Sequence, residues 1–178
     1  MKDNPMLADL ISNLIEDWTA ECPDIDPSAM DVVGRVMRLG DQFERDASAA
    51  LKKRGLRYTD FDILATLRRG GSPYELTPGA LANAVLLTSG AMTAALDRLE
   101  RGGHITRHFD KRDRRVRTAR LTKSGERIAL EAAKERFEVA RRNLEGLSPA
   151  DRAKLVLLLK QLEKNNIPWL SVNQPPGQ

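Results

Sequence analysis

The chain has 178 residues and a formal net charge of +4, with 41% hydrophobic and 30% charged side chains. This length fits one domain, and the apolar content exceeds that of a disordered chain. No apolar run reaches the roughly 18–20 residues that cross a bilayer, and residues 1–10 lack a secretory pattern, so we expect no membrane partner. Cys22 is the only cysteine, which excludes an internal disulfide and favours a reducing, cytoplasmic location.

The charge is distributed unevenly along the chain. Residues 1–31 contain one Lys and eight Asp or Glu, whereas residues 101–127 contain ten Lys or Arg and three Asp or Glu. A local basic cluster attracts polyanions far better than the same charge spread over a surface. The second segment therefore predicts binding to a polyanion such as nucleic acid.

Apolar residues at helical spacing, with Gly and Pro breaks between the periodic segments, predict a mainly helical chain. The first helix carries Leu7, Leu10, Leu14 and Trp18 on its apolar spacing. We expect helices over residues 7–20, 28–54, 59–69, 78–84, 89–101, 122–144 and 149–164.

Hydroxyl side chains stand where most of these helices begin. The predicted N-caps are Ser28, Thr59, Thr77, either Thr88 or Ser89, and Thr122. Thr77 is followed by proline, which favours the first position of a helix.

Two short strands, residues 104–109 and 115–121, flank a charged turn and form the only predicted ribbon. A short helix, a tight turn, a second helix and a basic hairpin define a winged helix-turn-helix. We therefore expect a mainly α fold with a small two-stranded β wing. The expected regions are an N-terminal and scaffold part, a DNA-binding part, a C-terminal helical part and a flexible tail, over residues 1–57, 58–122, 123–164 and 165–178.

The helix that begins TSGAMTAAL offers small and hydroxyl side chains for close approach to base edges. We expect Ser89, Ala91, Met92 and Thr93 to face a DNA groove and Arg98 to reach a phosphate. The alternative is that this segment is only a well-capped helix with a small-residue packing face.

The turn of the predicted wing holds Arg112, Arg114 and Arg115. An arginine there suits the minor groove, where negative potential is concentrated. The alternative is a solvated basic surface.

Three segments resemble the multiple-antibiotic-resistance regulator (MarR) family: FDILATLRR (61–69), LTPGALANAVLLTSGAMTAALDRLERGGHITR (76–107) and DKRDRRVRTARLTKSGE (110–126). The resemblance implies a homodimeric transcription regulator, usually a repressor released by a small ligand, with flanking dimerisation helices. It also implies that Asp113 pairs with an arginine and shapes the wing. A dimer predicts a near-palindromic operator on double-stranded DNA, with reading helices about 34–36 Å apart. The broad apolar surface of residues 155–162 needs a partner, which self-association supplies.

The extra N-terminal helix resembles the branch of this family that includes urate-responsive regulators. That resemblance implies a ligand pocket formed by Trp18, Asp62 and Arg107. Ala95 stands where the branch has an arginine, which removes a partner for urate and leaves another small aromatic or acidic effector open. The alternatives are that Trp18 is a packing anchor, Asp62 a surface acid and Arg107 a phosphate contact.

No constellation in the sequence favours catalysis, a metal or a cofactor. His104 and His108 lie four apart in a predicted strand, about 13 Å from each other and too far for one ion. The sequence does not favour a peroxide-sensing role for Cys22, because the neighbouring acids Glu21 and Asp24 disfavour a reactive thiolate. The rival to a ligand-responsive regulator is a non-specific architectural DNA-binding or protein-interaction module that lacks base readout.

Overall fold

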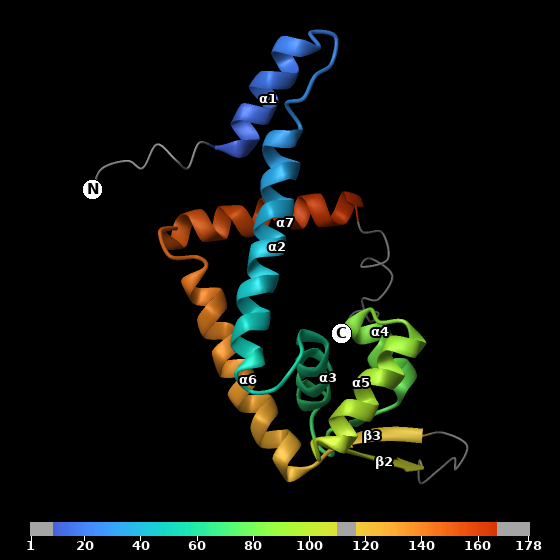
Figure 1. Ribbon diagram of the computed structural model, residues 1–178. Coiled ribbons are helices and arrows are strands. Elements are labelled where there is room, and N and C mark those ends of the chain that lie inside the picture. The colour runs from blue at the N-terminus through green and yellow to red at the C-terminus, as the bar shows by residue number, and fades with distance from the viewer. Residues whose placement is uncertain (1–8, 110–116, 167–178) are drawn as a thin grey trace, which may run out of the picture. The chain divides into compact units, whose positions relative to one another are not determined.

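A computed structural model describes residues 9–109 and 117–166 and is mainly helical (Figure 1). In these residues the helices are α1 (Leu10–Glu21), α2 (Met30–Lys52), α3 (Tyr58–Arg69), α4 (Pro78–Val85), α5 (Ser89–Arg101), α6 (Lys123–Arg142) and α7 (Pro149–Asn166). The strands are β1 (Glu75–Leu76), β2 (Ile105–Phe109) and β3 (Arg117–Leu121). The expected fold class, a mainly α chain with a small β wing, is confirmed.

Local capping chemistry explains where the two helices of the predicted helix-turn-helix begin. The Thr77 hydroxyl accepts from the Ala80 N–H at 3.2 Å, and the Thr88 hydroxyl accepts from the Ala91 N–H at 3.3 Å. Each bond satisfies one of the free N–H groups in a first helical turn. Both predicted caps are confirmed.

Two other predicted caps are wrong. Helix α2 begins two residues after Ser28, whose own N–H donates to Asp26 Oδ1 at 2.9 Å within the preceding turn. Helix α3 begins before Thr59, and its N-cap is Arg57. There the Asp60 carboxylate accepts from the Arg57 N–H at 3.2 Å, so a carboxylate three residues into the helix replaces a hydroxyl at its start.

The sheet has three antiparallel strands in the order β1–β3–β2, one more than expected. Glu75 of β1 pairs with Arg120 of β3, and Ile105 of β2 pairs with Leu121. The Glu75 carboxylate also accepts from the Thr118 hydroxyl and the Arg120 guanidinium, and these bonds lower the pKa of Glu75. This contact fixes the base of the wing against the strand that precedes α4.

One hydrophobic core unites α3, α4, α5 and the sheet. Its fully buried side chains come from every one of these elements except β1, and include Ile63, Leu64, Leu67, Leu81, Leu96 and Ile105. The i, i+1, i+4 spacing of Ile63, Leu64 and Leu67 turns one face of α3 inward.

Helix α1 packs against the N-terminal part of α2. A Cβ on Gly34 would lie 2.8 Å from Ile11 Cδ1, so the glycine permits close approach of the two helices. Asp9 caps α1 and also pairs with Arg35 of α2, which lowers the pKa of the Asp9 carboxyl.

Two compact units divide at Val139, and the second contains the end of α6 and α7. Arg152 closes the turn within this unit by donating to the carbonyl of Leu144 at 2.9 Å and of Leu147 at 3.1 Å. The side chains of Leu155, Val156, Leu157 and Leu158 remain exposed on α7.

In the described part of the chain, no single helix has the length and apolar character of a membrane span, although the bent pair of α4 and α5 would meet that test together.

Among the described glycines, Gly125 has the closest neighbouring backbone, so it should tolerate a side chain least. An added Cβ would lie 1.9 Å from the carbonyl oxygen of His104, at the join between α6 and β2. We expect Gly125→Ala to lower the free energy of unfolding by at least about 2 kcal/mol, since packed backbone cannot move aside. Gly79→Ala is the control, because nothing lies within 4 Å of its added Cβ. Urea denaturation that gives the two variants equal stability would contradict this packing.

Candidate nucleic-acid interface

Helices α4 and α5 cross at 110°, the angle of a helix-turn-helix. Leu86 makes the turn with a left-handed backbone (φ 54°), and the Leu87 N–H donates to the Ala82 carbonyl at 3.1 Å. In such a motif the second helix enters the major groove with its first residues foremost. The geometry therefore presents the start of α5 as the reading surface.

The first turns of α5 carry small, exposed side chains. Ser89, Ala91 and Thr93 all lie on the solvent side, as expected for a surface that approaches base edges. The Thr93 hydroxyl donates to the Ser89 carbonyl at 3.0 Å, which fixes its orientation and leaves its lone pairs outward. Their contact with DNA stays a prediction.

The expectation that Met92 faces the groove is wrong. Its side chain is only 2% exposed and belongs to the hydrophobic core with Leu96 and Leu99. A helix turns about 100° per residue, so the Met92 side chain points about 100° away from those of Ala91 and Thr93. This rotation is enough to turn Met92 toward the core. Met92 holds the reading helix against the core.

Arg98 has an internal partner in place of the expected phosphate. Its Nη2 lies 2.7 Å from Oδ1 of Asp60, whose residue is 4% exposed, and its Nη1 donates to the Ala94 carbonyl at 3.2 Å. A buried carboxylate needs such a partner. The pair ties α5 to the start of α3, and this role opposes the phosphate contact that we expected of Arg98. Asp60 was absent from the sequence prediction.

The tip of the wing, with Arg112, Asp113, Arg114 and Arg115, lies outside the described residues. On its stem, the Arg117 guanidinium lies over the exposed Phe109 ring, 5.2 Å from the ring centroid. The stem therefore adds a cation and an aromatic surface next to the predicted tip.

Arg107 joins the wing to the reading helix. Its guanidinium pairs with Asp97, and its Nε lies 3.4 Å from Oε2 of Glu100, near enough for an ion pair although it makes no hydrogen bond. The Arg107 N–H also donates to Glu100 Oε1 at 3.2 Å. Arg107 therefore spans β2 and two successive turns of α5.

Asp62 lines a cavity of about 230 Å³ between α3 and α6. Burial raises the pKa of the Asp62 carboxyl, against the opposing charges of Arg69 and Arg136, and this is the direction expected from its apolar neighbours. The cavity is lined by Phe61, Asp62, Ala65, Arg68, Arg69, Ala129, Leu130, Ala133 and Phe137. A half-buried carboxyl, two arginines and two phenylalanine rings suit a small aromatic acid.

Within one chain, Trp18 is not brought to Asp62. Trp18 is 48% exposed on α1, which packs at the N-terminal part of α2, whereas α3 follows the C-terminal end of α2 (Figure 1). Helix α2 has 23 residues and spans about 34 Å at 1.5 Å per residue. Ala95, at the position where the sequence departs from the urate-responsive pattern, is fully buried in the core.

The described ranges contain no candidate metal site. Residues 9–109 and 117–166 contain no group of three His, Cys, Asp or Glu side chains that would hold a metal ion.

A helix pair crossed at 110° and followed by an antiparallel wing defines a winged helix-turn-helix protein. The "MarR family" model matches residues 54–116. Over 155 residues the chain is 34% identical to the HTH-type transcriptional regulator PecS of Dickeya dadantii (strain 3937), an alignment that covers 87% of this chain and 93% of PecS. The chain therefore belongs to the MarR family, whose members are transcriptional regulators rather than enzymes.

Solved structures share the fold. A MarR mutant from E. coli complexed with operator DNA is 22% identical, with a TM-score of 0.65, and the alignment covers 82% of this chain and 96% of that one. BpsR of Bordetella bronchiseptica, whose DNA binding is regulated by 6-hydroxynicotinic acid, is 20% identical, with a TM-score of 0.65 and coverage of 74% and 92%.

Substitutions of the neighbouring residues Met92 and Thr93 of α5 should distinguish core packing from DNA contact. We expect Met92→Ala to lower the free energy of unfolding by about 2–4 kcal/mol, because it leaves a cavity in the core. Thr93→Ala should change stability by less than about 0.5 kcal/mol and weaken operator binding about threefold or more. Urea denaturation and fluorescence anisotropy measure the two effects. If Met92→Ala keeps the parent stability and weakens DNA binding, Met92 contacts the DNA groove and does not pack in the core.

Proposed function

We propose that this protein is a homodimeric, sequence-specific repressor whose operator binding is released by a small aromatic or acidic effector. The observation that carries the proposal is the reading helix: its inner face is fixed in the core, while its first turns offer Ser89, Ala91 and Thr93 to solvent. The MarR structure with operator DNA supports the same use of this fold. Because its target is chromosomal DNA, we assign the protein to the cytoplasm.

Uncovered apolar side chains support a homodimer. They lie on three helices of the single chain, α1, α2 and α7, and a surface this apolar normally has a partner. A two-fold dimer would cover the same surface on both copies and repeat the reading helix on one face of the duplex. The larger exposed members are Leu10, Val32, Val36, Met37, Val156 and Leu157.

The wing tip supplies the arginines of the proposed minor-groove contact. The sequence predicts that Arg112, Arg114 and Arg115 lie in a turn, and the described stem places Arg117 at the surface. Together with α5 they would form one basic surface, which fits the predicted DNA-binding region 58–122. The exposed apolar side chains of α7 fit the predicted dimerisation region 123–164.

The effector proposal starts from the cavity at Asp62. An aromatic acid of the kind named for BpsR would fit its two arginines and two phenylalanine rings. Trp18 would come from the partner subunit, because α1 of the same chain packs at the other end of α2. Arg107 would release Asp97 and Glu100 when it meets a competing anion, and this would free the wing from the reading helix.

Sequence discrimination tests the DNA proposal against a non-specific architectural module. We expect the protein to bind the region upstream of its own gene about 10³-fold more tightly than a scrambled duplex. Arg114→Ala should weaken binding and reduce the slope of log affinity against log salt by roughly one unit, since one phosphate contact is lost. Lys134→Ala, an exposed residue of α6, is the charge-matched control. Equal affinity for both duplexes in fluorescence anisotropy would favour the architectural module.

Asp62→Asn tests the effector cavity by two readouts. Burial raises the pKa of Asp62, so its contribution to stability is largest below the ordinary pKa and decreases as the pH rises through the raised value. The uncharged variant should therefore be more stable than the parent at neutral pH, with the difference vanishing in acid. It should also need at least about fivefold more salicylate or 6-hydroxynicotinate to release the operator, and Trp18→Ala should show the same loss. An unchanged release curve in both variants would remove the effector from this cavity.

A further inference from the structure

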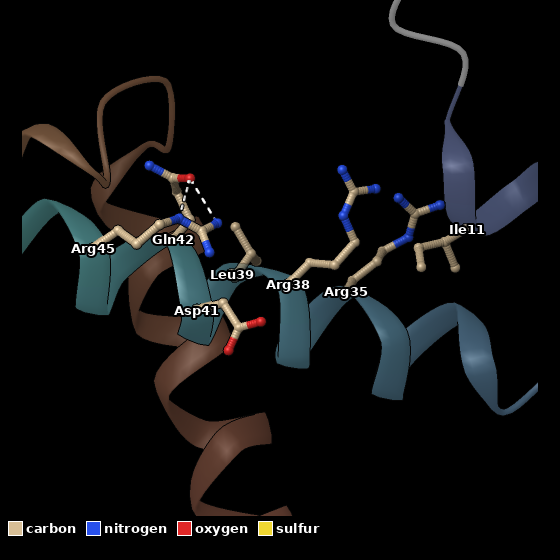
Figure 2. A pocket seen from close by; sticks show the side chains of 7 residues that line it. All are labelled: Ile11, Arg35, Arg38, Leu39, Asp41, Gln42 and Arg45. Atoms are coloured by element: carbon tan, nitrogen blue, oxygen red, sulfur yellow. Dashed lines mark hydrogen bonds between the residues drawn. The ribbon is translucent and has the colours of Figure 1, made fainter.

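A second cavity lies on α2, away from the reading helix and from Asp62. Its volume is about 390 Å³, within the roughly 300–1,000 Å³ that is typical of ligand sites. The side chains around it come from α2 and from Ile11 of α1 (Figure 2). They are Ile11, Arg35, Arg38, Leu39, Gln42 and Arg45, with Asp41 as the one acid.

The arginines of this cavity differ in their partners. Arg35 is held by Asp9, by Asp31 at 3.0 Å and by the Ser12 hydroxyl at 3.2 Å, so its charge is already compensated. Arg45 donates to the neutral Gln42 carbonyl at 2.9 Å, which orients its guanidinium without neutralising it. The cavity therefore contains one arginine whose charge is compensated, Arg35, and one that is oriented by a hydrogen bond but keeps its charge, Arg45.

Arg38 has no counter-charge in the described part of the chain, where it makes neither an ion pair nor a side-chain hydrogen bond. Figure 2 shows its guanidinium beside that of Arg35, on the side of α2 that faces Ile11 of α1, while the Asp41 carboxylate points the opposite way. A planar guanidinium without a partner presents two parallel N–H groups to a carboxylate. This is the group that an anion would meet first.

The cavity also has an apolar wall. Ile11 is buried against Gly34, and Leu39 is exposed next to the cationic groups. The aliphatic stems of Arg38 and Arg45 extend this wall. A ligand that fits must combine one negative end with an apolar body.

The arginine side of the cavity faces away from most of the proposed dimer surface of α2. At about 100° per residue, Arg38 and Arg45 lie roughly 120–180° around the helix from Val32 and Val36, whereas Leu39 lies within about 20–60° of them. A second copy on the exposed apolar side of α2 would therefore leave the arginine side open and border the cavity at Leu39.

We propose that this cavity binds an amphipathic monocarboxylate, with the carboxylate on Arg38 and Arg45 and the apolar body on Leu39 and Ile11. Binding bridges α1 and α2 and does not depend on the effector cavity at Asp62. The inference concerns ligand binding alone, so it holds whether or not the protein proves to be a repressor.

The test uses the full chain and 2-naphthoate as the probe, titrated by isothermal calorimetry. Arg38→Gln and Arg45→Gln should each weaken the affinity at least tenfold, because each removes one cationic partner of the carboxylate. Asp62→Asn impairs the effector cavity, which would also accept an aromatic acid, and this variant should retain one binding event that Arg38→Gln weakens in the same background. Lys134→Gln is the matched control for loss of one positive charge at an exposed helical site. Thermal unfolding of Arg38→Gln should match that of the parent, because Arg38 has no side-chain partner among the described residues.

Two further measurements define the ligand chemistry. The neutral 2-naphthamide should bind at least tenfold more weakly than 2-naphthoate, and inorganic phosphate should fail to displace the probe. Methyl NMR signals of Ile11 and Leu39 should shift during the titration. The proposal is overturned if Arg38→Gln keeps the parent affinity, if the amide or phosphate binds equally well, or if Asp62→Asn abolishes binding. It is also overturned if Arg38→Gln changes only the dimer dissociation constant in sedimentation, which would assign the arginines to an acidic segment of a second copy.

Discussion

The ion pair between Asp60 and Arg98 is the contact on which the arrangement of the reading surface depends. Asp60 also accepts from the Arg57 N–H, so one buried carboxylate both starts α3 and holds the later turns of α5. Removing either partner would leave an uncompensated charge at a site with little solvent. Because the pair acts at the C-terminal half of α5, it leaves the exposed first turns, with Ser89, Ala91 and Thr93, available to DNA, while Met92 packs in the core.

The wing is coupled to the same helix by a second set of charges. Arg107 of β2 contacts Asp97 and Glu100, which face solvent on α5, whereas Arg98 faces the interior. The two arginines therefore hold opposite sides of one helix, one rigidly through a buried carboxylate and the other through exposed ones. An exposed pair is worth little on its own and is easily exchanged for another anion. The contact between α5 and the wing is thus held less firmly than the contact between α5 and α3.

Local patterns predicted the elements well but not the contacts between them. Thr77 and Thr88 act within one helical turn, so their role is readable from sequence order. Met92 also has a local signal: with Leu96 and Leu99 it forms the i, i+4, i+7 stripe of a core-facing helix, whereas the residues on either side of it in sequence lie on the exposed face. The Asp60–Arg98 pair joins residues 38 apart in sequence, and the two-residue strand β1 exists only because β3 pairs with it, so neither leaves a local signal.

Helix α2 explains why charge is segregated in this chain. Its apolar side is uncovered in the single chain, and its arginine side faces α1, which belongs to the acidic residues 1–31. Asp9 neutralises Arg35 alone, because α1 is anchored at Gly34 and its acids cannot follow α2 further along its axis. Arg38 and Arg45 lie beyond that anchor and are exposed, and among the described residues neither makes an ion pair. Helix α2 thus packs against α1 at Gly34 while its arginine side keeps positive charge that the acids of α1 do not compensate, and a surface of this kind attracts anions.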